Sequence, residues 1–108
     1  MSLVGKHCTP SREGTPAIAG HDATSLLAEL DGWTIEDGKR LVRSWKLADF
    51  RAALAFVNRI GEIADAEDHH PDIELGWGRV AVTLWTHTVG GLSENDFIVA
   101  ARIDAVRR

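Results

Sequence analysis

The sequence predicts an α+β fold, a four-stranded antiparallel sheet with three helices on one face, in the order α-β-β-α-β-β-α. Two pairs of strand-like segments are each joined by a short turn that contains glycine, which is typical of antiparallel hairpins. Three segments with helical periodicity stand before, between and after these pairs. Of the 108 residues, 44% are hydrophobic, so one domain with a packed core is expected.

The first helix is expected over residues 23–30, where three leucines form one apolar stripe, and Asp22 is placed to cap its first turn. The first hairpin follows, with strands over residues 33–36 and 39–47. Its turn is predicted at Asp37-Gly38, a pair that favours tight hairpin turns. The hydrophobic alternation of the returning strand is imperfect and leaves its two faces unassigned.

The second helix is expected over residues 48–66 and has the longest helical pattern in the chain. It must end by about Asp68, because Pro71 disfavours helical geometry at His70. The two adjacent histidines therefore leave the helix end in different directions. The apolar stripe that is expected to face the core comprises Phe50, Leu54, Val57, Ile60 and Ala64.

The second hairpin is expected from strands over residues 73–75 and 79–86, joined by a turn at Gly76-Trp77-Gly78. A last helix is expected to begin after Ser93 and to reach about Ala105. Its first turns are apolar nearly all round, which indicates burial on more than one side. In so small a chain, a second buried side suggests an interface between subunits.

Residues 1–20 are interpreted as an irregular N-terminal arm, and residues 21–108 as the folded domain. The arm contains prolines and glycines without a sustained period, and a solvated tail is the interpretation we favour. His7 and Cys8 stand together in it, but two metal ligands without others nearby are a weak signal. Cys8 is the only cysteine, so an internal disulfide and a cysteine zinc cluster are excluded.

The net charge and hydropathy of the chain limit the kinds of molecule that it is expected to bind. The net charge is -4, with acidic and basic residues mixed along the chain, which argues against a nucleic-acid-binding surface. No apolar run approaches the roughly 20 residues of a membrane span. These features favour a cytoplasmic enzyme or binding module.

The polar stretch from Asp65 to Asp96 is the candidate site, since it holds His69, His70 and His87. Asp65 and His69 are four residues apart at a helix end, so their side chains can meet and the carboxylate can fix the imidazole tautomer. Each residue also has a structural interpretation. A histidine at a helix end complements the dipole, and an aspartate three residues after a serine belongs to a capping box. His87 alone would be a surface polar residue, and tryptophans at 77 and 85 would be core or interface aromatics.

A three-histidine metal site is the main competing interpretation. Zinc hydrolases place two histidines one turn apart on a helix, whereas His69 and His70 are adjacent and followed by Pro71. They cannot share one helix face, so a metal is not expected. A nucleophile is missing too, because Cys8 lies in the arm and no serine stands in an elbow motif. Metal-free acid–base chemistry by histidine remains.

The spaced motifs resemble the pterin-4a-carbinolamine dehydratase family. The family signature is an acidic residue, three residues, His-His-Pro, an aromatic, a strand ending in Thr-His, and Gly-Leu-Ser/Thr-x-x-Asp opening a helix. The matching residues here are Asp65, His69, His70, Pro71, Trp77, Thr86, His87, Gly91, Leu92, Ser93 and Asp96. The resemblance extends from about Leu26 to Ile103. The family commonly has glutamate where this chain has the shorter Asp65.

The resemblance implies the fold given above, assembled as a homodimer or homotetramer. It also implies an activity, the loss of water from 4a-hydroxytetrahydropterin to give quinonoid dihydropterin, with no metal or cofactor of the enzyme's own. The reaction recycles the cofactor of aromatic amino-acid hydroxylases, which are one class of possible protein partner.

The resemblance further implies roles for eight residues. His69 and His87 are the hypothesised acid and base, and His70 orients the pterin. The supporting or substrate-binding residues are Asp65, Pro71, Trp77, Thr86 and Asp96.

Binding proteins in the same family provide a rival function. Some relatives resemble a dimerisation cofactor for a transcription factor, and others an assembly factor for RuBisCO encoded near carboxysome genes. The retained histidines favour the enzyme, because a scaffold has no chemical need for them. The arm and the apolar last helix would serve a partner under the rival interpretation, with a carboxysome-associated location.

Overall fold

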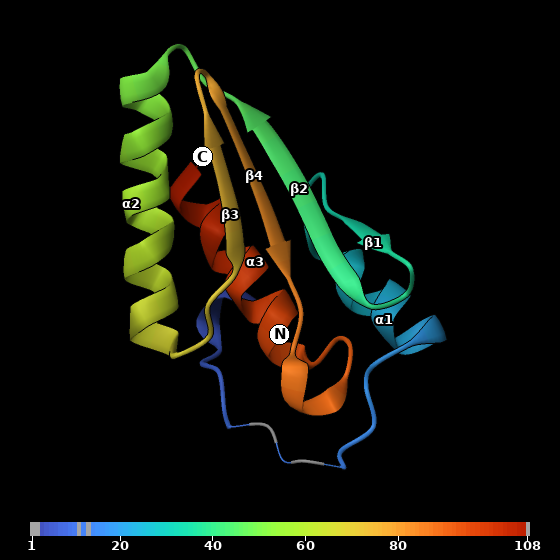
Figure 1. Cartoon of the computed structure of the whole chain (residues 1–108). Helices are drawn as coiled ribbons and strands as arrows, with labels where there is room; N and C mark the ends of the chain where they lie inside the picture. Colours follow the sequence, from blue (N-terminus) through green and yellow to red (C-terminus); the bar gives the residue numbers. More distant parts are fainter. Residues whose placement is uncertain (1–2, 11, 13, 108) are drawn as a thin grey trace.

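The computed structural model confirms the α+β fold, and it describes residues 3–10, 12 and 14–107. Four antiparallel strands form one sheet in the order β1-β2-β4-β3, and three α-helices pack with it (Figure 1). The helices are α1 (Gly20–Leu27), α2 (Phe50–Glu67) and α3 (Glu94–Arg107), with short 3-10 turns η1 (Leu3–Gly5) and η2 (His87–Val89). The strands are β1 (Thr34–Glu36), β2 (Arg40–Lys46), β3 (Asp72–Gly76) and β4 (Arg79–Leu84).

The turn between β1 and β2 forms where the sequence predicts it. Asp37 and Gly38 have φ values of 54° and 68°, the left-handed geometry that suits a tight turn between twisted strands. Glu36 then pairs with Arg40 across the hairpin. Aspartate tolerates this conformation better than most residues, which explains its place beside the glycine.

The pairing of the two central strands decides which sheet face is buried. Leu41 of β2 lies opposite Leu84 of β4, and Trp45 lies opposite Val80, so these four side chains share one face. All four are buried in the core. The sequence of β2 alone did not show which of its faces is buried. Its pairing with β4 decides this, because the valines and the leucine of β4 all point into the core.

The second helix confirms part of its predicted core stripe, since Ile60 and Ala64 are buried, but the first half of the stripe differs. Phe50 and Leu54 are 46% and 42% exposed, so their assignment to the core was wrong. The stripe that packs inward begins one turn later on the neighbouring face, where a small alanine allows close approach and Phe56 stacks edge-on against Trp45. Its buried members are Ala53, Phe56, Ile60 and Ala64. Two large apolar side chains are thus left on the outer surface of α2.

The first helix is shifted from its predicted bounds. It begins at Gly20 after an N-cap at Ala19, so Asp22 lies inside the first turn and does not cap it. Its carboxylate there still complements the positive end of the helix dipole. The helix ends at Leu27, before the predicted residue 30, and the chain continues in turns to β1.

The second buried side of α3 is covered by the chain's own N-terminal arm. Leu3 of η1 is only 2% exposed and belongs to the hydrophobic core, and η1 packs against α3. The apolar surface of α3 therefore needs no second subunit to account for it. The interpretation of the arm as a solvated tail is wrong for its described residues 3–10, whereas positions 1, 2, 11 and 13 lie outside the described residues. The domain boundary at residue 21 stays a prediction.

A buried carboxylate on α3 ties the first hairpin to the helix layer. Asp104 accepts hydrogen bonds from Trp33 Nε1 at 2.9 Å and from Arg43 Nη1 at 2.7 Å. We expect Asp104→Ala to lower the free energy of unfolding by about 3 kcal/mol, because it leaves a buried indole N–H without its acceptor and a partly buried guanidinium without its carboxylate partner. Urea denaturation of both proteins measures this loss.

Asp104→Asn is the matched control for that prediction. Trp33 and Arg43 both donate to Oδ1, so an amide oxygen in that position can still accept from both, and the loss of stability should be clearly smaller than that of the alanine variant. Equal losses for both variants would show that the negative charge, and not the acceptor geometry, supplies the stabilisation.

Candidate active site

The site is organised by the way α2 ends. Asp68 takes the left-handed conformation, with φ 50° and ψ 43°, and the N–H of His69 bonds to Ala64 O at 3.1 Å. This closes the helix one residue beyond the last helical position, as the proline at position 71 predicts. His69 and His70 leave the reversed backbone in different directions and find different partners.

His69 turns inward and meets Asp96 in the first turn of α3. Its Nε2 lies 2.6 Å from Asp96 Oδ1. The His69 side chain is 13% exposed and the Asp96 side chain is fully buried. A short contact between a nearly buried imidazole and a buried carboxylate holds the ring in one orientation.

Asp96 receives two further hydrogen bonds. Its Oδ2 accepts from the Thr86 hydroxyl at 2.8 Å and from the Ser93 N–H at 2.9 Å. The bond to Ser93 is half of the predicted capping box, while the Ser93 hydroxyl bonds to the Thr86 hydroxyl at 2.8 Å. The backbone bridge from Thr86 to Gly91 closes the loop that contains η2. Because both oxygens of Asp96 act as acceptors, Nε2 of His69 is the donor in their contact and carries the ring proton.

His70 faces solvent and pairs with Asp65. The distance from His70 Nε2 to Asp65 Oδ1 is 2.9 Å, and both side chains are mostly exposed. The predicted meeting of Asp65 with His69 is therefore wrong. The helix does not continue through His69, so the spacing of one helical turn no longer brings these two side chains together.

His87 begins η2 at the end of β4. Its ring packs on Trp85 with 3.7 Å between centroids, and its side chain is exposed. Its neighbours Thr86 and Thr88 both line the cavity described next. The backbone of His87 is therefore at the rim of that cavity, with the imidazole directed toward Trp85.

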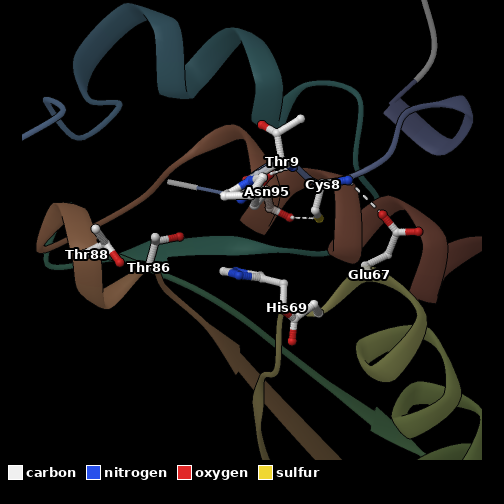
Figure 2. Close-up of a pocket in the computed structure, with 9 residues that line it drawn as sticks. Cys8, Thr9, Glu67, His69, Thr86, Thr88 and Asn95 are labelled. Atoms are coloured by element: carbon white, nitrogen blue, oxygen red, sulfur yellow. Dashed lines mark hydrogen bonds between the residues drawn. The ribbon is translucent and has the colours of Figure 1, made fainter. Parts of the chain in front are cut away.

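A cavity of about 250 Å³ lies beside His69 (Figure 2). Of the predicted site residues, it brings together His69 and Thr86, with Asp96 buried behind them. Its other walls come from the end of α2, from the start of α3 and from the N-terminal arm. The lining residues are Cys8, Thr9, Pro10, Glu67, Asp68, His69, Thr86, Thr88 and Asn95.

The arm residues in this wall were missed by sequence reasoning. No periodicity or motif spacing connects residues 8–10 to a helix end 60 residues away, so no local signal could have placed them here. Asn95 and Glu67 were missed for a related reason, because their partners are backbone groups of the arm. Among the described residues, no group of three or more His, Cys, Asp or Glu side chains is placed to hold a metal ion.

Glu67 and Cys8 set the electrostatics of the arm wall. The N–H of Cys8 donates to Glu67 Oε1 at 2.7 Å, and His7 Nδ1 lies 2.9 Å from Oε2. The bond from Cys8, followed by that from His7, holds the pKa of Glu67 below its usual range. Burial, followed by the nearby Glu67 carboxylate, raises the pKa of the Cys8 thiol to about 12. The thiol is therefore protonated and poorly nucleophilic at neutral pH.

Trp77 lies far from this cavity. It stands in the turn between β3 and β4, at the opposite end of the hairpin from Pro71, and it is 75% exposed (Figure 1). A five-residue strand separates the two positions by roughly 15 Å. Within one chain Trp77 does not line the His69 cavity, and its role in substrate binding stays a prediction.

Comparison with known proteins gives the same family as the motifs. The sequence model of the family described as pterin 4 alpha carbinolamine dehydratase matches residues 16–106. The chain belongs to the pterin-4a-carbinolamine dehydratase family. Two similar relatives carry the provisional name pterin-4-alpha-carbinolamine dehydratase. The one from Rubrobacter xylanophilus is 45% identical, covering 94% of this chain and 95% of that protein. The one from Halorhodospira halophila is 44% identical, covering 98% of each.

Two solved structures are similar in fold. A transcriptional coactivator/pterin dehydratase from Brucella melitensis has a TM-score of 0.79 and 34% identity, covering 83% of this chain and 97% of that one. A pterin dehydratase-like protein described as a RuBisCO assembly factor in the alpha-carboxysome has a TM-score of 0.60 and 23% identity. The similar region covers 69% of this chain and 88% of the assembly factor. At 23% identity, the similarity shows only that the two proteins share a fold.

Proposed function

We propose that the chain dehydrates pterin-4a-carbinolamine in the cavity beside His69, and that the contact between His69 and Asp96 is the observation that carries this assignment. In the reaction the proton on N5 is removed, the C4a hydroxyl is protonated and leaves as water, and a C4a=N5 double bond forms. The substrate therefore gives quinonoid dihydropterin and water, with no electron transfer. The protein has to supply one proton acceptor, one proton donor and a fixed substrate position.

His69 is suited to be one of the two proton-transfer groups. Its Nε2 is held by Asp96 at 2.6 Å, which leaves Nδ1 as the ring nitrogen that can exchange a proton with the substrate. Asp96 also stabilises the positive charge that the imidazole acquires when it takes up a proton. The hydrogen bonds from the Thr86 hydroxyl and the Ser93 N–H hold the carboxylate in place during this change.

His87 is the proposed second proton-transfer group. Its backbone lies at the cavity rim, its imidazole is exposed, and an exposed side chain changes rotamer on a picosecond-to-nanosecond timescale. Rotation away from Trp85 would direct it toward a substrate held against Thr86 and Thr88. His70, paired with Asp65 on the surface, and the half-buried Pro71 are proposed to border the pterin without exchanging its protons.

The test is the decay of 4a-hydroxytetrahydropterin, generated in place by an aromatic amino-acid hydroxylase, with wild type and His87→Ala measured side by side. Wild type should accelerate dehydration above the uncatalysed rate, and the variant should lose about 10²-fold or more of that acceleration. An exposed side chain can be removed without harm to the fold, so circular dichroism should be unchanged. Wild-type turnover in His87→Ala would remove this residue from the mechanism.

No acceleration by folded wild type would overturn the enzyme assignment. The alternative is then a protein-binding family member, and capture of RuBisCO or a hydroxylase by the tagged chain would be the next experiment.

Homo-oligomers are proposed in either case, supported by the exposed apolar pair Phe50 and Leu54 on α2. Among the described residues, no helix has the length and apolar character required to cross a bilayer.

A further inference from the structure

The cavity beside His69 is completed by a segment outside the region that the family model matches. That region begins at residue 16, whereas Cys8, Thr9 and Pro10 line the cavity. All three line the same cavity as His69 and Thr86, and Figure 2 shows Cys8 and Thr9 beside Asn95. The arm therefore contributes to the site although the shared domain does not include it.

Several independent contacts fix this segment, which is called the strap below and comprises residues 6–10. Arg102 Nη2 donates to Lys6 O at 2.6 Å, and Lys6 Nζ lies 2.9 Å from Glu94 Oε2. Glu67 accepts from the Cys8 N–H at 2.7 Å. These anchors come from the end of α2 and from α3, the two helices that also position His69 and Asp96.

Asn95 makes the contact closest to the cavity. Its Nδ2 donates to Thr9 O at 2.7 Å, and its Oδ1 accepts from Thr9 N at 3.1 Å. The side-chain amide thus pairs with both backbone groups of one strap residue, as a neighbouring strand would. Asn95 is itself buried and Thr9 is exposed, so the two bonds are partly shielded from water.

Asn95 and Asp96 are consecutive residues in the first turn of α3. Asp96 fixes His69 on one side of the cavity, and Asn95 fixes Thr9 on the other. The separation of the catalytic imidazole from the strap is thereby set by one short piece of rigid backbone. A ring-shaped substrate between them would be held at a constant distance from His69.

We propose that the strap is a substrate-contacting wall of the site, that Thr9 and Pro10 form its contact surface for the pterin ring, and that Asn95 is the positioning residue that holds it. This proposal rests on the proposed function. The proline ring is apolar and the neighbouring threonine is polar, so together they can contact both the face and the polar edge of a heterocycle. A substrate in the cavity can contact both residues without displacing the His69 side chain from Asp96.

Cys8 provides a built-in reporter of strap docking. The docked thiol, with its pKa raised to about 12, should react slowly with iodoacetamide at pH 8. When the strap leaves α3, the thiol loses both its burial and the influence of Glu67. Its pKa then falls toward the ordinary value of 9.0, and alkylation should accelerate at least about tenfold.

Asn95→Ala is the variant that tests the proposal, and Asn58→Ala, at an exposed asparagine of α2, is its matched control. We expect Asn95→Ala to speed alkylation of Cys8, to raise KM for the carbinolamine about tenfold and to change kcat less than threefold. Asn58→Ala should match wild type in all three measurements. A purely structural role for Asn95 would not separate KM from kcat in this way.

Rapid alkylation of Cys8 with an unchanged KM would overturn the proposal, because the strap would then have left without consequence for the substrate. That result would leave the dehydratase assignment intact. The dehydratase assignment fails only if wild type itself does not accelerate dehydration. If Asn95→Ala does not fold, Thr9→Trp decides instead. It should raise KM while Cys8 stays slow to alkylate, and an unchanged KM in this variant would equally overturn the proposal.

Discussion

Replacement of His69 by alanine is expected to lower kcat for carbinolamine dehydration by about 10²- to 10⁴-fold, the usual contribution of a positioned acid–base group. His69 is the one histidine that lines the described cavity, and Asp96 fixes its tautomer. Because its side chain is nearly buried, some stability is expected to be lost as well. Stopped-flow absorbance of the decaying carbinolamine measures the rate, and a thermal scan confirms that the variant is folded at the assay temperature.

His70→Ala is the matched control for this prediction. It removes the adjacent imidazole, which is exposed and hydrogen-bonded to Asp65 on the surface. We expect a changed KM and a kcat within a few-fold of wild type. A folded His69→Ala variant with wild-type kcat would contradict the assignment, as would a larger loss in His70→Ala than in His69→Ala.

Asp96→Asn is expected to reduce kcat nearly as much as removal of His69, with little change in KM. Asp96 uses both oxygens as acceptors, Oδ1 for His69 and Oδ2 for Thr86 and Ser93. Asparagine has only one such oxygen. If that oxygen stays with Thr86 and Ser93, its NH₂ group faces His69 Nε2. The imidazole must then move its proton to Nδ1, the atom that would otherwise exchange a proton with the substrate.

The same stopped-flow assay tests this substitution, and Asp104→Asn provides its control. Both variants replace a buried aspartate of α3 by the isosteric amide, but Asp104 serves Trp33 and Arg43 and not His69. We expect Asp104→Asn to keep kcat while losing stability. An Asp96→Asn enzyme with a normal kcat would mean that the tautomer of His69 is not set by this carboxylate.

The sequence predicted the order of the elements because local signals were strong where the chain turns. The Asp37-Gly38 turn, the break before Pro71 and the alternating valines of β4 each depend on a few neighbouring residues. The same reasoning assigned Phe50 and Leu54 to the core. Helical periodicity gives two adjacent apolar stripes on α2, and only packing against Trp45 selects the one that contains Phe56.

The site was less predictable than the fold, because its partners are distant in the sequence. The motif named His69 and Asp96 but paired Asp65 with the wrong histidine, since one left-handed residue at position 68 redirects the chain. Trp77 matched the motif by type and order, yet the hairpin carries it away from the cavity. The strap residues matched no motif at all, and their contact with Asn95 becomes visible only when the two ends of the chain are folded together.

The measurement that tests the central claim most directly is a set of imidazole ¹⁵N chemical shifts for His69, recorded before and after addition of a stable dihydropterin. The account predicts a ring protonated at Nε2, and a large movement of the Nδ1 resonance when the pterin binds beside it. A ring protonated at Nδ1 alone would contradict the geometry with Asp96. A pterin that binds without moving either His69 resonance would place the dehydration site elsewhere on the protein.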